Sequence, residues 1–129
     1  MRIVVFSGTT EGRDFSRAAA ALGIAVTVSV ATDLGAEEQG QAPGITVHSG
    51  RLLPGAMAEL LQGAALCVDA THPYARVVTE NLRGAVDTLK SLEKDAHFPI
   101  YLRLERKIDG ITEADGIATN CLLYTSDAA

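Results

Sequence analysis

Short apolar runs alternate with segments of helical spacing along most of this chain, and this alternation limits the folds that it can adopt. Strands are expected at residues 2–6, 24–30, 45–48, 65–69 and 99–103. Helices are expected at residues 11–22, 54–62 and 73 to about 95, where apolar side chains recur every three or four positions. This order predicts an α/β protein: a doubly wound parallel sheet with right-handed crossovers and helices on both faces.

Residues between and after these elements mark turns and a domain boundary. Gly23 and Gly63 each follow a predicted helix, where glycine commonly ends the helix. Residues 31–44 are polar and glycine-rich, so we expect a loop there. Beyond residue 106 the pattern fails, because residues 107–120 carry Asp-Gly turns and residues 121–129 end without an amphipathic element. We therefore expect a first domain at residues 1–106, with residues 107–129 beginning a linker or second domain.

Charge and composition exclude several classes of protein. The 16 acidic and 11 basic residues give a net charge of −5, which argues against general nucleic-acid binding. No apolar run approaches the ~18 residues of a membrane span, and a strand follows Met1 directly, so we expect a cytoplasmic protein without membrane association. Cys67 and Cys121 have neither metal-ligand nor disulfide spacing, so no metal site is predicted and Cys67 is expected to be a small buried residue.

The loop after the first predicted strand is rich in glycine and threonine. Its two glycines lie four residues apart, which differs from the G-x-G-x-x-G spacing of dinucleotide-binding loops. The chemistry still suits a phosphate, since glycines let the backbone approach an anion and a helix begins there. The candidate cofactor-binding residues are Gly8, Thr9, Thr10, Glu11, Gly12 and Arg13. The alternative is a tight strand-to-helix turn in which Thr10 caps the helix.

The end of the second predicted strand bears on the choice of cofactor. NAD-binding domains usually place an acid there for the ribose 2′-hydroxyl. This chain offers the hydroxyls of Ser29 and Thr32, and its first acid is Asp33 in the following loop. That arrangement leaves room for a 2′-phosphate and favours NADPH over NADH. Alternatively, Ser29 and Thr32 merely cap a loop.

A carboxylate, a hydroxyl, an imidazole and a phenol occur within six residues at the end of the fourth predicted strand. Asp69 is expected to accept hydrogen bonds from loop N–H groups, Thr71 to cap the next helix and Pro73 to occupy its first turn. These structural roles leave His72 and Tyr74 unexplained. Both are therefore candidates for chemistry at the carboxyl edge of the sheet, against the alternative of a structural or solvated histidine.

Arginines follow the predicted ends of two strands in a chain that is acidic overall. Arg51, Arg103 and Arg106 lie there, and a cluster of guanidinium groups would attract a polyanionic substrate. The alternative for any one of them is an ordinary solvated surface charge.

Five segments together resemble a known family. They are GTTEGR (residues 8–13), VSVAT (28–32), GRL (50–52), DATHPYA (69–75) and YLRLER (101–106). In this order they resemble the N-terminal half of the precorrin-6A reductase family, including its cobalt-precorrin-6A counterpart, over residues 1–106.

The resemblance implies the first of two Rossmann-like domains, with ligands in the cleft between them. It implies reduction of a corrin precursor, an anionic tetrapyrrole, with NADPH or NADH in cobalamin biosynthesis. His72 and Tyr74 would then be the catalytic candidates for proton delivery. The substrate-binding candidates would be Arg51, Asp69, Thr71, Arg103 and Arg106. Residues 121–129 do not resemble the family and read as foreign sequence ending an incomplete fragment, so activity is expected of the longer protein.

Two other functions remain open from the residues themselves. One is a different nucleotide-dependent enzyme, such as a sugar-nucleotide epimerase, and the DATHPYA segment argues against it. The other is a non-enzymatic module that senses a dinucleotide. Such modules usually keep the ribose-binding acid that is absent after the second predicted strand.

Overall fold

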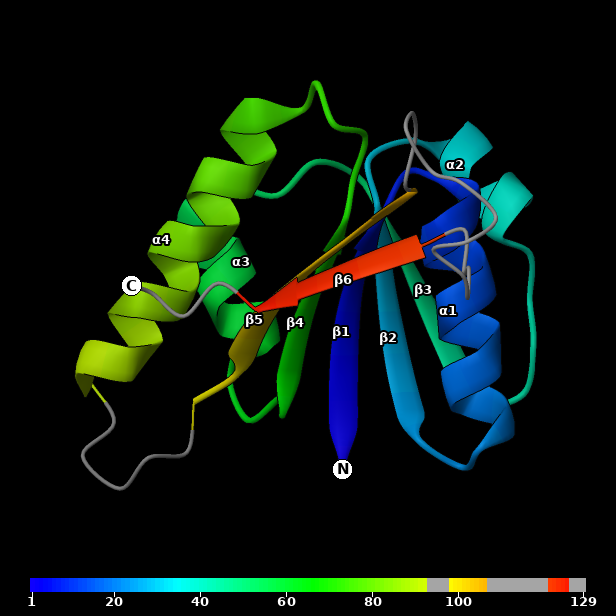
Figure 1. Ribbon diagram of the computed structural model, residues 1–129, viewed down its shortest axis with the longest axis horizontal. Helices are drawn as coiled ribbons and strands as arrows, with labels where there is room; N and C mark the ends of the chain where they lie inside the picture. The colour runs from blue at the N-terminus through cyan, green and yellow to red at the C-terminus, as the bar shows by residue number, and fades with distance from the viewer. Residues whose placement is uncertain (93–97, 107–120, 126–129) are drawn as a thin grey trace, which may run out of the picture.

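A single twisted sheet with helices on both faces forms the protein. The computed structural model describes residues 1–92, 98–106 and 121–125, and Figure 1 shows the arrangement of their elements. The strands are β1 (Arg2–Ser7), β2 (Ala25–Val30), β3 (Ile45–Ser49), β4 (Leu66–Ala70), β5 (Ile100–Arg106) and β6 (Cys121–Thr125). The helices are α1 (Thr10–Ala21), α2 (Asp33–Gln39), α3 (Pro54–Leu61) and α4 (Arg76–Leu92).

The order of the strands places a switch point at the centre of the sheet. The order is β3-β2-β1-β4-β5-β6, and β1 through β5 are parallel. The chain moves outward from β1 to β3, then returns to the other side of β1 with β4. The carboxyl ends of β1 and β4 therefore flank the crevice where ligands bind in open α/β sheets. The predicted doubly wound parallel α/β fold is confirmed.

Two apolar layers cover the two faces of the sheet. On one face, Val4 and Phe6 of β1 pack with Met57 and Leu61 of α3 and with Leu82 of α4. On the other face, alternate residues of β1 and β2 pack beneath α1 and α2. Figure 1 shows α3 and α4 on one side of the strands and α1 and α2 on the other. Cys67 is fully buried in the first layer, as the sequence predicted.

The prediction of a loop at residues 31–44 is wrong in part, because residues Asp33–Gln39 form α2. Thr32 caps this helix by accepting a hydrogen bond at its Oγ1 from the backbone N–H of Gly35, 3.0 Å away. The helix has only seven residues, and Leu34 on it is exposed. A helix this short, without an apolar stripe, leaves no periodic signal in the sequence.

Two other element boundaries differ from the prediction. The longest helix begins at Arg76 rather than at Pro73, because residues 71–75 form a turn in which Ala75 N–H donates to His72 O at 2.8 Å. Strand β5 extends to Arg106, so Arg103 lies within the strand and not past its end. The part of the helix expected at residues 93–95 lies outside the described residues.

The chain beyond β5 carries a strand that the sequence did not indicate. Residues Cys121–Thr125 form β6, which pairs antiparallel with β5, Leu104 lying opposite Leu123. Residues 107–120 and 126–129 lie outside the described residues, so the expected domain boundary stays a prediction. In the part of the chain that is described, no helix is both long and apolar enough to span a membrane.

Helix α1 approaches the sheet closely because Gly12 has no side chain. A Cβ built on Gly12 would overlap Ser7 Oγ and would lie 2.9 Å from the Ala70 Cβ. Ser7 ends β1 and Ala70 ends β4, so Gly12 sits over the switch point. In dinucleotide-binding loops the last glycine has this same packing role.

Replacing Gly12 by alanine is therefore expected to destabilise the protein. Alanine stabilises a helix by about 1 kcal/mol relative to glycine. Overpacking against Ser7 and Ala70 costs roughly 1–3 kcal/mol. Because these neighbours are rigid, we expect the cost of overpacking to exceed the gain in helix propensity. Denaturant unfolding of Gly12→Ala should give a lower free energy of unfolding. The control is Gly84→Ala on α4, where the added Cβ meets nothing within 4 Å and stability should rise. Equal stabilisation by both changes would contradict this role of Gly12.

Candidate active site

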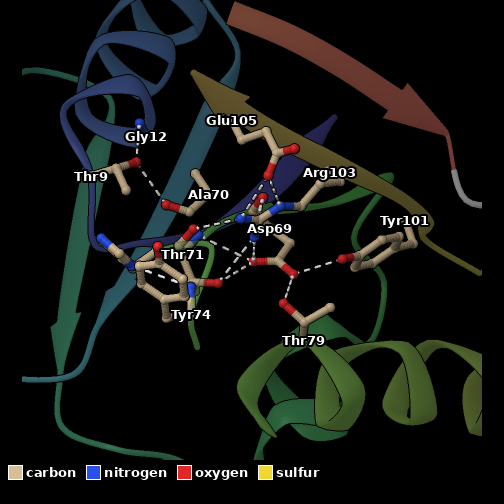
Figure 2. Close-up of polar contacts among 11 residues, drawn as sticks. Thr9, Gly12, Asp69, Ala70, Thr71, Tyr74, Thr79, Tyr101, Arg103 and Glu105 are labelled. Carbon is tan, nitrogen blue, oxygen red and sulfur yellow. Dashed lines mark hydrogen bonds and ion pairs between the residues drawn. The ribbon is translucent and has the colours of Figure 1, made fainter. Parts of the chain in front are cut away.

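The two loops that the sequence singled out meet at the crevice between β1 and β4. A Cβ built on Gly8 would lie 3.9 Å from both the Thr71 Cα and the His72 backbone nitrogen. Thr9 joins the two loops, since its hydroxyl donates to the Ala70 carbonyl at 2.8 Å (Figure 2). The same Oγ1 accepts from Gly12 N–H at 3.2 Å, so Thr9 and not Thr10 caps α1. The two loops therefore lie next to each other at this crevice.

Gly8 itself is not required by the fold. Its backbone does not adopt the left-handed region, and the nearest atoms to a Cβ at this position lie at ordinary contact distance. Gly8 is also exposed, unlike Gly12. The space beside its backbone is therefore available to a ligand.

A polar cavity of about 490 Å³ lies between the first loop and the end of β2. Its lining includes these predicted cofactor-binding residues: Gly8, Thr9, Thr10, Glu11, Arg13 and Thr32. Three residues of α2, Gly35, Glu38 and Gln39, complete one wall. The cavity thus combines a helix start, hydroxyl groups and a guanidinium, which suit a phosphate, with the carboxylates of Glu11 and Glu38, which suit ribose hydroxyls instead.

A larger and more apolar cavity of about 590 Å³ lies between the carboxyl ends of β1 and β2 and the starts of α3 and α4. Leu53, Tyr74 and Val77 line it although their side chains are 78%, 85% and 69% exposed. Arg51 and Arg76 also line it. Large apolar side chains exposed together around a hollow indicate a surface that another molecule covers.

The two cavities share a common wall. Ser7, Gly8 and His72 line both, as do Val30 and Ala31 at the end of β2. One elongated ligand that passes over Gly8 would therefore enter both cavities. His72 would lie beside that ligand where it crosses from one cavity to the other.

Asp69 is the centre of the hydrogen-bond network beneath the second loop (Figure 2). Its side chain is fully buried and accepts from the hydroxyls of Thr79 and Tyr101, each at 2.6 Å. Thr71 donates to it from its hydroxyl at 2.7 Å and from its backbone N–H at 3.2 Å. Arg103 Nη1 forms an ion pair with it at 2.9 Å. Asp69 therefore joins β4, β5, α4 and the loop.

This network sets the charge of the buried groups. Burial alone would raise the pKa of the Asp69 carboxyl, but the hydrogen bonds from Thr79, Tyr101 and Thr71 and the charge of Arg103 together lower it. Asp69 is therefore ionised at neutral pH. Burial and the bond to Asp69 raise the pKa of Tyr101, so the phenol keeps its proton and stays a donor.

His72 and Tyr74 lie in the turn before α4. Pro73 occupies the second position of this turn, where its fixed φ is favoured. Tyr74 N–H donates to His72 Nδ1 at 3.2 Å, which fits the tautomer whose hydrogen is on Nε2. The two rings lie 5.1 Å apart between centroids and both are exposed. An imidazole, oriented by the hydrogen bond at its Nδ1, and a phenol are thus presented at the rim of the apolar cavity.

The structure separates the predicted substrate-binding residues into three groups. Arg51 and Thr71 line the apolar cavity. Ser29, which was predicted to bind the cofactor, lines this cavity as well. Asp69 and Arg103 are instead engaged within the protein: Arg103 also donates to Thr71 O at 2.9 Å and pairs with Glu105. The side chain of Arg106 lies outside what the structure describes. A fully buried Asp69 has no surface for a substrate, so its geometry supports a positioning role.

Sequence reasoning did not single out some residues of the site. Gln39 gave no signal, because it lies in a segment expected to be a loop. Val77 did carry a signal in the sequence, since it is apolar but lies outside the buried stripe of its helix. Leu53 precedes Pro54 and reads as an ordinary helix-start residue, although it is exposed beside the cavity.

The sheet order and the glycine-threonine loop at the switch point define a Rossmann-like α/β protein. A family model described as precorrin-6x reductase CbiJ/CobK matches residues 2–119, and the chain belongs to this family. The chain is 38% identical over 88 residues to the cobalt-precorrin-6A reductase of Salmonella typhimurium strain LT2. That alignment covers 67% of this chain and 33% of the relative, so the chain spans about a third of the curated relative's length. No solved structure matches the chain significantly.

Removing the charge of Asp69 is expected to destabilise the fold strongly. Asp69→Asn keeps the shape but places an NH₂ donor among five donor groups and leaves Arg103 without its buried partner, which costs about 3 kcal/mol or more. Denaturant unfolding at pH 7 measures the loss. The exposed Asp87→Asn on α4 is the control and should change stability little.

The pH dependence should follow the same carboxylate. Because the folded-state pKa of Asp69 is lowered, its contribution is present above the unfolded value of ~3.9 and is lost as the pH falls through the folded value. Asp69→Asn should flatten the acid limb of the stability curve. An unchanged acid limb together with wild-type stability would contradict this account.

Proposed function

We propose that the protein containing this chain reduces a corrin-ring precursor, precorrin-6A or its cobalt form, with hydride from a nicotinamide cofactor in cobalamin biosynthesis. One observation carries the proposal: a polar and an apolar cavity meet at Gly8 and His72 over the switch point of the sheet. A dinucleotide crossing Gly8 would place its adenosine end in the polar cavity and its nicotinamide end beside the apolar one. Membership of the reductase family supports the same reaction.

The cofactor-binding residues fit a dinucleotide. Gly8 leaves its backbone open to a phosphate, and Thr10 is exposed at the first turn of α1. Thr9 and Gly12 have structural roles. Thr9 joins the loop to β4, and Gly12 lets α1 lie close to the sheet. We propose NADPH over NADH, because hydroxyls rather than an acid end β2 and Arg13 lines the same cavity.

The apolar cavity fits one edge of a carboxylate-bearing macrocycle. Leu53, Tyr74 and Val77 offer apolar contact to a flat ring, and Arg51 and Arg76 offer charge to its carboxylates. Since the chain spans about a third of its relative, the rest of the protein would complete the cleft.

The residues of the second loop would hold and protonate the substrate. The nicotinamide supplies hydride, and reduction of a ring double bond also consumes a proton. In this step His72 would act as the imidazolium, giving up one proton to become the neutral imidazole, and Tyr74 would offer its phenol; both line the apolar cavity. Asp69 keeps this loop in place through Thr71.

Cofactor binding is tested most directly at Gly8. In a full-length protein containing this chain, wild type should bind NADPH more tightly than NADH in a fluorescence titration. Gly8→Val should weaken binding of both by more than ~10-fold, about 1.4 kcal/mol, because a branched side chain occupies the path of the phosphate. The melting temperature should change little, since the fold leaves space there. Unaltered affinity in the folded variant would reject the cofactor site.

Proton delivery is tested at His72. General acid–base assistance is typically worth ~10² to 10⁴ in rate, so His72→Ala in the full-length protein should lower kcat by about that factor. Its side chain is exposed, so the melting temperature should stay near that of wild type. Tyr74→Phe keeps the ring and removes only the hydroxyl, which separates stacking from proton transfer. Normal turnover combined with a large loss of stability in His72→Ala would show a structural imidazole instead.

A further inference from the structure

Gln39 has a buried side-chain donor that meets no hydrogen-bond partner among the described residues. It is the last residue of α2 and is only 3% exposed. Its Nε2 is buried and forms no hydrogen bond with any part of the chain that the structure describes. A buried amide without a partner costs free energy of folding, and this one lies in the wall of the polar cavity.

The backbone around Gln39 is held firmly before any ligand binds. Arg17 of α1 donates from its guanidinium to the Gln39 carbonyl at 2.9 Å. Gly40 follows with φ of +70°, a left-handed conformation that ends the helix, and its N–H donates to Ala36 O at 3.1 Å. The amide of Gln39 is therefore positioned by α1 and by the end of α2 rather than by a partner of its own.

A second donor in the same cavity lacks a hydrogen bond. Arg13 Nε is buried and makes no hydrogen bond among the described residues, and its ion-pair contact with Asp14 is long at 3.6 Å. Arg13 and Arg17 lie four residues apart on α1, so they share the helix face that meets α2. Within the described chain, Arg13 Nε and Gln39 Nε2 are the buried side-chain donors without partners, and both residues line the polar cavity.

We propose that Gln39 and Arg13 together bind a phosphate ester on the adenosine half of the dinucleotide, with Gln39 as a residue that determines cofactor affinity. The proposal rests on the proposed cofactor function of this cavity. A phosphate is rich in acceptors and anionic, so it satisfies an amide donor and a guanidinium at once. The ester is either the 2′-phosphate of the ribose or the 5′-pyrophosphate.

The experiment compares Gln39→Met with Gln62→Met in the full-length protein. Methionine matches glutamine in length but donates no hydrogen bond, and Gln62 is exposed and distant from the cavity lining. Gln39→Met should weaken NADPH binding at least 10-fold while the melting temperature without ligand stays equal or rises. Gln39→Glu, which replaces the donor with a negative charge, should weaken binding more. Gln62→Met should change neither quantity.

Adenosine 2′-phosphate and adenosine 5′-monophosphate serve as competitors that separate the two esters. Selective loss of affinity for either one in Gln39→Met supports the proposal and identifies the ester. Unchanged affinity for both, or a lowered melting temperature with normal affinity, overturns it. If wild type binds NADPH and Gln39→Met binds it equally, only this inference fails. If wild type binds neither NADPH nor NADH, both this inference and the proposed function fail.

Discussion

The buried carboxylate of Asp69 supports the carboxyl edge of the sheet on which the candidate site is built. It accepts hydrogen bonds from the neighbouring strand β5, from α4 and from the loop that follows β4. A buried charge is stable only when charges and donors around it replace water, and here Arg103 and three hydroxyl groups do so. The position of His72 depends on this network, because Thr71 is held by it from both sides.

A second set of contacts joins the first loop to that edge. Thr9 links it to the end of β4, and Gly12 allows α1 to lie against Ser7 and Ala70. These residues leave Gly8 exposed beside Thr71 and His72. The residues around Gly8 are thus fixed by packing while Gly8 itself stays open, which is the arrangement that a preorganised ligand site requires.

Two of the arginines that the sequence singled out, Arg103 and Arg51, have different surroundings in the structure. Arg103 lies inside β5 and is occupied by Asp69, Thr71 and Glu105. Arg51 is exposed at the apolar cavity, where we propose that it contacts an anionic substrate. Sequence places both near strand ends, but the boundary of β5 and the strand pairing decide which one finds its partners within the protein. A guanidinium that already has its partners adds stability rather than substrate affinity.

Hydrophobic periodicity in the sequence was enough to predict the class of fold and the two loops. Because parallel strands bring their carboxyl ends together, it also implied that both loops lie at one edge of the sheet. The sequence singled out His72 and Tyr74 as candidates by elimination. Two of the local roles assumed for their neighbours, Thr71 as the helix cap and Pro73 in the first helical turn, are wrong because α4 begins at Arg76. The tertiary structure was needed to show that Asp69 and Arg103 form an ion pair, that α2 exists and that Gln39 Nε2 has no hydrogen-bond partner among the described residues. Those outcomes depend on contacts between residues distant in sequence, on burial and on donor geometry, none of which leaves a local pattern.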